Sequence, residues 1–310
     1  MWYDGTTMKK TIIGVVIVVL LAVGAYFLFG RPSDTDVVPN GPDTTQGPDG
    51  AQPTSTAPTA PEDGPESVIG KSVEGRDITA YHFGSGSTDV LFVGGIHGGY
   101  EWNTSLVAFE LIDHLKNNPN VIPEGVRVTV IPILNPDGLN KVVGVAGRFA
   151  AADVTASAAV QVTGRFNANN VDLNRNFDCD WQASAKWQDK TVSGGTAAFS
   201  EPESAAMKAY IEARRPDAVV VWYSAAGGVF SSSCHDGVLA ETNALTNAYA
   251  KASGYKGYES YDFYETTGDM ANWLAKIKVP AISVLLTNHT GTEWSKNRAG
   301  AEAILKYYAE

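Results

Sequence analysis

The feature that most constrains the fold is the alternation, from about Glu66 onward, of short apolar runs with segments of helical spacing. The apolar runs are typical of buried strands and cover residues 89–96, 126–134, 218–222 and 280–286. Helices are predicted over residues 103–115, from Ser200 to about residue 213, and over the C-terminal run AGAEAILKYY. Near-continuous apolar strands separated by helices predict one α/β domain with a mostly parallel sheet covered on both faces.

Local signals predict where these elements begin and end. Leu106, Phe109 and Leu111 lie on or near one face of the first predicted helix. Residues 200–203, Ser-Glu-Pro-Glu, form a capping-box pattern that predicts the start of the second helix. Residues 135–138, Asn-Pro-Asp-Gly, predict a turn that stops the second strand.

An uncharged apolar run occupies residues 11–29, TIIGVVIVVLLAVGAYFLF. As a helix it is about 28 Å long, close to the thickness of a bilayer core. Lys9 and Lys10 precede it and an acidic tract follows Arg31, so residues 1–10 are expected in the cytoplasm. We expect a single-pass anchor in the cell membrane, with the rest of the chain extracellular. A cleaved signal peptide and a buried core helix are the alternatives, but GAYFLFGRP matches a cleavage site poorly.

Composition divides the rest of the chain into two parts. Residues 30–66, rich in Pro, Thr, Asp and Gly, predict a flexible linker, and residues 67–310 are predicted to form the folded domain. The 310 residues include 34 acidic and 23 basic side chains, a net charge of −11, which argues against nucleic acid as a partner. Cys179 and Cys234 are too few for a disulfide scaffold; outside the cell they could form one disulfide, which the sequence alone does not establish.

Polar side chains follow several of the predicted strands. In open sheets of this kind, ligands bind outside the carboxyl ends of the strands. His97, Asn135 and Tyr223 fall at such ends, as do the residues after Leu285. The sequence therefore predicts the functional site at this edge of the sheet.

Two segments carry side chains suited to chemistry. GGIHGGYEW places His97 and Glu101 on a glycine-containing turn, and imidazole nitrogen and carboxylate oxygen are ligands that zinc accepts. GRFNANNVDLNRNF brings together Arg165, Arg175 and several Asn, and arginine matches carboxylates through two-point contacts. The alternatives are a loop histidine bonded only to backbone and a solvated polar loop.

Together with the Asn-Pro-Asp-Gly turn, these segments resemble the zinc carboxypeptidases of the carboxypeptidase A/B type. VDLNRNF is the most specific stretch, and the resemblance covers the chain from about Ser67 to the C-terminus. It implies one α/β domain with a mixed, mostly parallel eight-stranded sheet and one zinc ion held by a His, a Glu and a second His. His97 and Glu101 match the first two ligands, although three residues rather than the commoner two separate them.

The resemblance also implies a substrate and the residues that bind it. Arg165 matches the arginine that polarises the scissile carbonyl, and Asn174 and Arg175 match the pair that holds the terminal carboxylate. Tyr264 matches the mobile tyrosine that closes over the substrate. The implied reaction removes the C-terminal residue of a peptide, or of a cell-wall stem peptide, by attack of a metal-activated water.

Two positions depart from the family pattern. Tyr223 stands where the family has its second zinc His, and a phenol with a pKa of about 10 is a poor zinc ligand at neutral pH. Leu285 stands where the family has its general-base Glu and cannot transfer a proton. Since such a base typically supplies roughly 10²–10⁴-fold in rate, activity is expected to be impaired and zinc to be weakly held or absent.

Other side chains are candidates to replace the missing groups. His235 is the favoured replacement ligand, and His289, four residues after Leu285, is the alternative. Glu265 and Glu293 are further carboxylates with less support.

Two functions follow from this pattern. The first is a membrane-anchored extracellular metallocarboxypeptidase, a hydrolase impaired at two positions. The second is an inactive module of the same fold that binds peptide C-termini. A purely structural surface protein is disfavoured, because it would not need this set of polar residues in one crevice.

Overall fold

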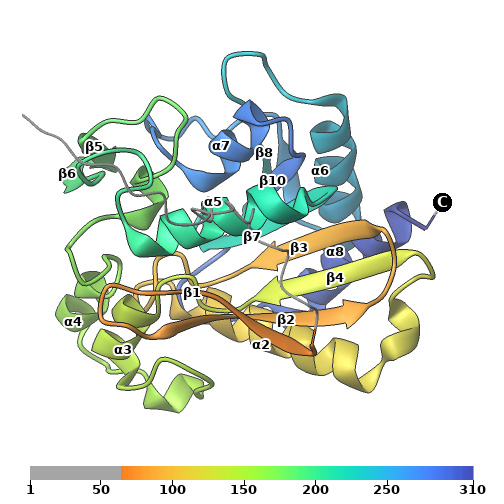
Figure 1. The fold of residues 1–310 in the computed structure, drawn as a ribbon, viewed down its shortest axis with the longest axis horizontal. Coiled ribbons are helices and arrows are strands. Elements are labelled where there is room, and N and C mark those ends of the chain that lie inside the picture. The colour runs from red at the N-terminus through yellow and green to blue at the C-terminus, as the bar shows by residue number, and fades with distance from the viewer. Residues whose placement is uncertain (1–63, 310) are drawn as a thin grey trace, which may run out of the picture. The chain divides into compact units, whose positions relative to one another are not determined.

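The computed structural model describes residues 64–309, and the two ends of the chain are drawn in Figure 1 as a grey trace. The predicted cytoplasmic segment, membrane anchor and nearly all of the predicted linker lie outside the described residues. Within residues 64–309, no helix has the length and apolar character needed to cross a membrane.

The described residues form ten strands and seven α-helices. The strands are β1 (Glu66–Lys71), β2 (Asp77–Gly84), β3 (Thr88–Val93), β4 (Val126–Ile131), β5 (Ser184–Trp187), β6 (Lys190–Ser193), β7 (Ala218–Ser224), β8 (Gly228–Ser231), β9 (Lys256–Tyr258) and β10 (Ala281–Leu286). The helices are α2 (Trp102–Asn117), α3 (Pro136–Val143), α4 (Ala158–Thr163), α5 (Pro202–Arg214), α6 (Ala240–Ser253), α7 (Met270–Lys276) and α8 (Trp294–Tyr307). Three short 3₁₀ turns are η1 (Pro119–Val121), η2 (Ala151–Asp153) and η3 (Leu173–Arg175).

One mixed sheet of eight strands forms the centre of the domain, in the order β1-β2-β4-β3-β7-β10-β8-β9 (Figure 1). The central strands β4, β3, β7 and β10 are parallel, and β8 and β9 pair parallel with each other. The pairs β1–β2, β2–β4 and β8–β10 are antiparallel. The predicted mixed eight-stranded sheet is therefore confirmed. Strands β5 and β6 form a separate hairpin.

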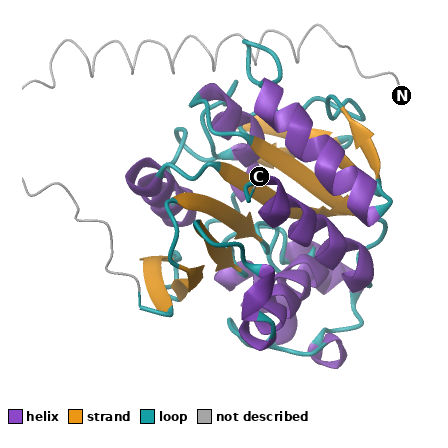
Figure 2. Cartoon of the chain, turned by 90° about the vertical axis from the view of Figure 1, so that its right-hand side faces the viewer, coloured by secondary structure: helices purple, strands orange, loops and turns teal. Residues whose placement is uncertain are grey.

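Helices cover both faces of this sheet (Figure 2). One core lies under α2, α6 and α8 and includes Phe92 and Trp222, whose rings stack at 5.4 Å. The other lies under α5 and α7 and includes Leu91 and Val221. Since neighbouring residues of a strand point to opposite faces, β3 and β7 contribute to both cores, and all side chains of β7 are buried.

Two local predictions are corrected by the structure. The capping box expected at residues 200–203 does not form: α5 begins one residue later, with Glu201 as its N-cap and no side-chain cap. Ser200 instead donates its hydroxyl to the Glu201 carboxylate, and Pro202 occupies the first helical position, where proline fits. The turn expected at residues 135–138 is the first turn of α3, because the side chain of Asn135 caps that helix.

Candidate functional site

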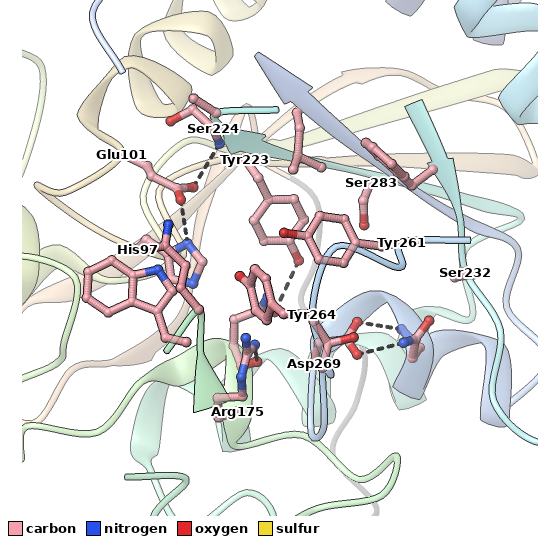
Figure 3. A pocket seen from close by; sticks show the side chains of 18 of the residues that line it. His97, Glu101, Arg175, Tyr223, Ser224, Ser232, Tyr261, Tyr264, Asp269 and Ser283 are labelled. Atoms are coloured by element: carbon pink, nitrogen blue, oxygen red, sulfur yellow. Dashed lines mark hydrogen bonds and ion pairs between the residues drawn. The ribbon is translucent and has the colours of Figure 1, made fainter. Parts of the chain in front are cut away.

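A cavity of about 160 Å³ opens at the carboxyl ends of the central parallel strands, where the sequence predicted the site. Eight of the sequence-predicted site residues line it: His97, Glu101, Arg165, Asn174, Arg175, Tyr223, Tyr264 and Leu285. In Figure 3 the His97 and Glu101 side chains lie on one side of this pocket, with Arg175 below and Tyr223 and Tyr261 across from them.

Two glycines let the site-forming segments approach one another. Gly98 has φ +44°, and a Cβ atom there would lie 2.7 Å from the carbonyl oxygen of Gly164. A Cβ on Gly138 would lie 2.4 Å from the same oxygen. In addition, the Asn135 side chain donates to the carbonyl of Arg165 at 3.3 Å. Glycine at these positions therefore brings the segments at 97–101, 135–138 and 164–165 into contact.

His97 and Glu101 are buried side by side and offer atoms that can bind a metal ion. The Nδ1 atom of His97 lies 3.0 Å from Glu101 Oε1, yet neither ring nitrogen of His97 forms a hydrogen bond within the described part of the chain. The second carboxylate oxygen of Glu101 accepts from the backbone N–H of Ser224 at 3.0 Å. Burial favours the protonated acid, but His97 and then Arg165 outweigh it, and the pKa of Glu101 is lowered. An ionised carboxylate beside a free imidazole nitrogen is suited to hold a cation.

Asp172 supports this pair from behind and was not singled out from the sequence. Its Oδ1 atom lies 3.4 Å from His97 Nε2, and its Oδ2 atom accepts from Nε of Arg165 at 2.9 Å. Burial favours the protonated acid, but the Arg165 guanidinium outweighs it and holds the pKa of Asp172 well below its usual range. A carboxylate that contacts a metal-binding histidine commonly orients its ring. The position of Asp172 within the VDLNRNF motif is the sequence signal that could have identified it.

Arg165 is held on three sides and is almost fully buried. Besides Asp172, its guanidinium lies 3.8 Å from Glu101 Oε1 and stacks over the Trp187 ring at 4.3 Å. Trp187 comes from the small β5–β6 hairpin, which no sequence signal connected with the site. The hairpin thus completes the wall that positions Arg165 at the pocket.

Arg175 forms a second cationic wall. Its Nε donates to the carbonyl of Lys186 at 2.8 Å and its Nη1 to the carbonyl of Asn174 at 2.5 Å. Burial alone would lower its pKa, but Asp172 and then Tyr264 outweigh this, and the pKa is raised. The guanidinium therefore stays charged and, through its remaining N–H groups, can bind an anion in the pocket.

Tyr223 keeps its proton. The phenol donates to Asn174 Oδ1 at 3.1 Å, and burial raises its pKa well above the ordinary value. A phenol that is both protonated and committed to Asn174 is not a ready metal ligand. Leu285 lies directly opposite Tyr223 on the neighbouring strand β10 and offers no polar atom.

Of the side chains considered as replacements for the missing ligand and base, only one of the histidines lines the pocket. The His235 side chain is 67% exposed, lies 3.0 Å from Asp180, and is absent from the pocket wall, so the structure does not place the favoured substitute at the site. His289 does line the pocket, with Nδ1 2.7 Å from the Ser224 hydroxyl. Glu265 does not line the pocket, and Glu293 is engaged with Thr287.

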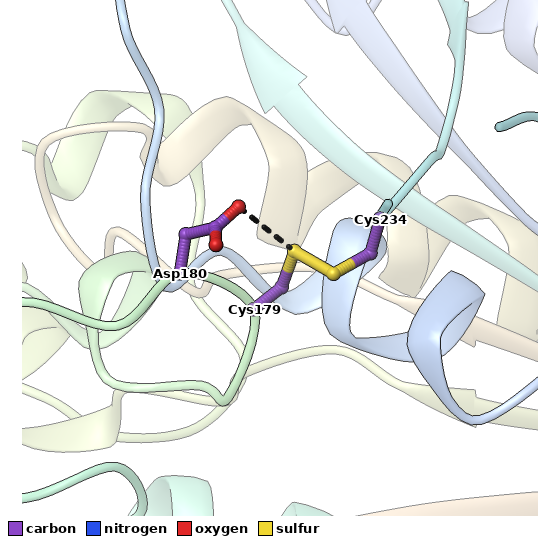
Figure 4. A group of neighbouring side chains, drawn as sticks. All are labelled: Cys179, Asp180 and Cys234. Atoms are coloured by element: carbon purple, nitrogen blue, oxygen red, sulfur yellow. Dashed lines mark hydrogen bonds between the residues drawn. A yellow bond between two sulfur atoms is a disulfide. The ribbon is translucent and has the colours of Figure 1, made fainter. Parts of the chain in front are cut away.

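Cys179 and Cys234 are joined by a disulfide, the pairing that the sequence left open (Figure 4). With Asp180 they form the one cluster of three close His, Cys, Asp or Glu ligand atoms found within residues 64–309. Because both sulfur atoms are bonded to each other, this cluster is not a zinc site.

The pocket extends into a polar recess that the sequence did not reveal. Ser232, Ser283 and Asp269 line it, beyond Tyr223 and Tyr261 (Figure 3). Asp269 is buried and accepts two hydrogen bonds from Asn272, and burial raises its pKa. These side chains come from separate strands and loops, so only the fold brings them together.

Comparison with known proteins identifies the family of the chain. The profile described as zinc carboxypeptidase matches residues 65–293 of the chain. The chain belongs to the zinc carboxypeptidase family. This family is zinc-dependent, and its fold is the single α/β domain with a mixed sheet described above.

The individual relatives share little of their sequence with the chain. The chain is 28% identical to the human carboxypeptidase N catalytic chain over 184 residues, which cover 55% of this chain and 37% of that protein. It is 32% identical to rat carboxypeptidase Z over 122 residues, 35% of this chain and 17% of that protein. The chain therefore matches well under half the length of these two relatives.

Solved structures show the same fold at low sequence identity. Carboxypeptidase A from Helicoverpa armigera gives a TM-score of 0.60 at 20% identity, covering 79% of this chain and 69% of that one. Murein-tripeptide amidase MpaA from Escherichia coli O157 gives 0.52 at 20% identity, covering 78% of this chain and 92% of that one.

The zinc implied by the family fits the residues only in part. His97 Nδ1, buried without a hydrogen bond, and the ionised Glu101 are suited to two of the family's three ligand positions. The third position holds Tyr223, whose proton and hydrogen bond to Asn174 oppose coordination. The side chains present thus supply two of three protein donors.

Proposed function

We propose that the chain is an extracellular, membrane-anchored hydrolase that removes the C-terminal residue of peptides slowly. The observation that carries this proposal is the pair of buried guanidinium groups, Arg165 and Arg175, in the same pocket as the His97–Glu101 pair. The two cationic walls suit a terminal carboxylate and a peptide carbonyl, two groups that are close together at a free C-terminus.

Each side chain then has a chemical role. Arg175 binds the terminal carboxylate, with Asn174 beside it in the pocket wall. Arg165 donates toward the scissile carbonyl and stabilises the negative charge that develops on its oxygen. Zinc, when bound at His97 and Glu101, would supply a polarised water. Tyr264, close to Arg175, is the group that covers the substrate.

Tyr223 and Leu285 support a slow reaction. Tyr223 offers a protonated phenol in place of a third ligand, and Leu285 offers no base. Loss of a general base alone lowers rates by roughly 10²–10⁴-fold. The same two residues favour a second candidate function, in which the pocket binds peptide C-termini without cleaving them.

The polar recess favours substrates whose last residue has a polar or cationic side chain. Three serines from Ser231 to Ser233, together with Ser283 and Asp269, line this part of the pocket. The similar fold of the murein-tripeptide amidase from Escherichia coli supports cell-wall stem peptides as one substrate class.

The uncharged run at residues 11–29 supports membrane anchoring with the domain outside the cell. Alkaline carbonate extraction of membranes tests it: the full chain should stay in the pellet. The variant with Val18→Arg and Leu20→Arg should appear in the supernatant, because each central arginine disfavours insertion by about 2.5–3.5 kcal/mol. Extraction of the wild-type chain would contradict anchoring.

Metal analysis of the purified chain, with a carboxypeptidase assay on peptides ending in Lys, tests the proposed reaction. Zinc together with slow release of the terminal residue supports hydrolysis. Tight peptide binding without any release, even at saturating zinc, would instead support the binding function. Catalytic release with no dependence on a free C-terminal carboxylate would contradict both.

A further inference from the structure

His289 lines the pocket but has no role in the reaction proposed above. The chain leaves β10 after Leu286, turns, and brings the imidazole into the pocket wall. There its ring packs against Tyr100 with centroids 4.7 Å apart, and its Nδ1 atom lies 2.7 Å from the Ser224 hydroxyl. The side chain is therefore held from two sides on the strand end that also carries Leu285.

Hydrogen bonds around Asn103 fix which nitrogen of His289 carries the proton. The Asn103 amide donates to the carbonyls of Asn288 at 2.7 Å and Gly291 at 3.0 Å, so its Nδ2 and Oδ1 atoms cannot be exchanged. Its Oδ1 atom then faces the Ser224 hydroxyl at 3.2 Å and needs a donor. The single hydroxyl proton of Ser224 fills that need.

The consequence for His289 follows directly. The Ser224 hydroxyl donates its one hydrogen bond to Asn103 Oδ1, so toward His289 its oxygen can only accept. Nδ1 is therefore the protonated nitrogen of the neutral His289 ring. The Nε2 atom then carries a lone pair. It has no hydrogen-bond partner in the structure described for residues 64–309, and the side chain borders the pocket.

The charged and titratable groups facing His289 are Glu101, His97, Arg165 and the phenol of Tyr100. Burial lowers the pKa of His289, so the neutral ring with its free Nε2 lone pair prevails near pH 7. A neutral imidazole with one nitrogen anchored and the other open is the arrangement of a histidine general base.

We propose that His289 transfers the proton that the leucine at position 285 cannot. This rests on the proposed hydrolysis. His289 Nε2 takes one proton from water as the water oxygen forms its bond to the terminal peptide carbonyl carbon. The imidazolium then gives that proton to the peptide nitrogen as the C–N bond breaks. The new carboxyl group releases its remaining proton to solvent, and His289 is neutral again.

One substitution in the full chain separates the roles of the two ring nitrogens of His289. His289→Asn keeps an N–H donor at the Nδ1 position, and hence the bond to Ser224, but removes Nε2. It should lower kcat by roughly 10²-fold or more and leave the Kd for the peptide within about twofold. Its rate should also lose the acid limb that the wild-type rate shows as pH falls below the His289 pKa. His114→Gln is the matched control. His114 lies in the last turn of α2 and pairs with Glu302 of α8, so this variant should leave kcat unchanged.

Ser224→Ala tests the positioning role independently of rate. Nitrogen-15 NMR of the wild-type imidazole should show Nδ1 protonated and Nε2 unprotonated, and Ser224→Ala should shift this population toward the other tautomer. A wild-type ring protonated at Nε2 would overturn the inference. So would a His289→Asn variant with wild-type kcat, which would leave the proposed hydrolysis intact. Absence of turnover in the wild-type chain would overturn the hydrolysis itself, and His289 would then have no proton to transfer.

Discussion

Tyr223 and Leu285 are direct neighbours, paired in register on the adjacent parallel strands β7 and β10. Both are almost fully buried and both contribute to the core under α5 and α7. The two departures from the family pattern therefore lie side by side.

Reversing both departures should restore the family chemistry. The double variant Tyr223→His with Leu285→Glu is expected to raise zinc occupancy to one per chain and to raise kcat by roughly 10²-fold or more, because it gains the third zinc ligand and adds the family's carboxylate base to proton transfer by His289. Elemental analysis after dialysis and a carboxypeptidase assay measure the two effects. Tyr223→Phe is the control and should leave zinc occupancy unchanged. A folded double variant with neither gain would show that these positions are assigned incorrectly.

Asp172 should be a main contributor to the stability of the site. Replacing it by Asn leaves the buried Arg165 guanidinium without its closest carboxylate, which costs about 3–5 kcal/mol in the free energy of unfolding. The matched control is Asp178→Asn, whose exposed pair with Lys276 is worth less than about 1 kcal/mol. Urea unfolding at pH 7 measures both, and equal losses would contradict the assignment.

The same pair predicts a pH dependence. The pKa of Asp172 is lower in the folded protein than its ordinary value of about 3.9 in an unfolded chain. Its stabilising contribution is therefore complete above that value and is lost progressively as the pH falls below it. Between pH 5 and pH 3 the wild-type protein should lose more unfolding free energy than the Asp172→Asn variant. Parallel losses in the two proteins would argue against the coupling.

Much of the fold could be predicted from sequence because its central strands are buried on both faces. The four predicted strands correspond to β3, β4, β7 and β10, which form the parallel centre of the sheet. Strands β8 and β9 were missed because they are short and contain Gly228 and Gly257. Strands β1, β2, β5 and β6 were missed because most of their side chains are exposed or only half-buried. Short, exposed or glycine-containing strands lack the apolar periodicity that predicts a buried strand.

The residues of the candidate site also fall into those that the sequence could predict and those that it could not. Residues within one motif, such as His97 with Glu101, could be predicted from their spacing. Trp187, Asp269 and His289 enter the pocket from separate loops and a hairpin, so their proximity depends on the whole fold. His235 was preferred over His289 from the sequence, which does not give the direction of either side chain. In the structure His235 lies beside Asp180 and outside the pocket wall, whereas His289 lines the pocket.

Arg175 should determine recognition of a free C-terminus. Arg175→Lys keeps the charge but loses the planar fork, and the Kd for a peptide carboxylate should rise roughly 10–100-fold. A peptide with an amidated C-terminus should bind both proteins equally weakly, since it has no carboxylate to lose. Arg148→Lys, in an exposed pair with Asp113, is the control variant. Calorimetry measures all of these, and an unchanged Kd in Arg175→Lys would place the carboxylate elsewhere.

The Cys179–Cys234 disulfide should stabilise the domain strongly for a single bond. It joins residues 55 positions apart, and closing such a loop in the unfolded chain is worth about 4 kcal/mol. The double variant Cys179→Ala with Cys234→Ala should lose about this amount in urea unfolding. Dithiothreitol should lower the stability of the wild-type protein to a similar level and leave the variant unchanged. Insensitivity of the wild-type protein would mean that the bond is absent in solution.

Asp269 should set the preference for the last side chain of the peptide. It is the one carboxylate among the residues that line the polar recess, alongside serines at positions 232 and 283. A charged hydrogen bond to a substrate ammonium group is worth about 1.5–3 kcal/mol, so peptides ending in Lys should bind at least about tenfold more tightly than those ending in Leu. Asp269→Asn keeps an acceptor for the Asn272 backbone N–H, preserving the start of α7, but removes the charge. It should abolish the preference for Lys while leaving the Kd for the Leu peptide within about twofold, measured by calorimetry. An unaltered preference in this variant would assign side-chain recognition to other residues of the pocket.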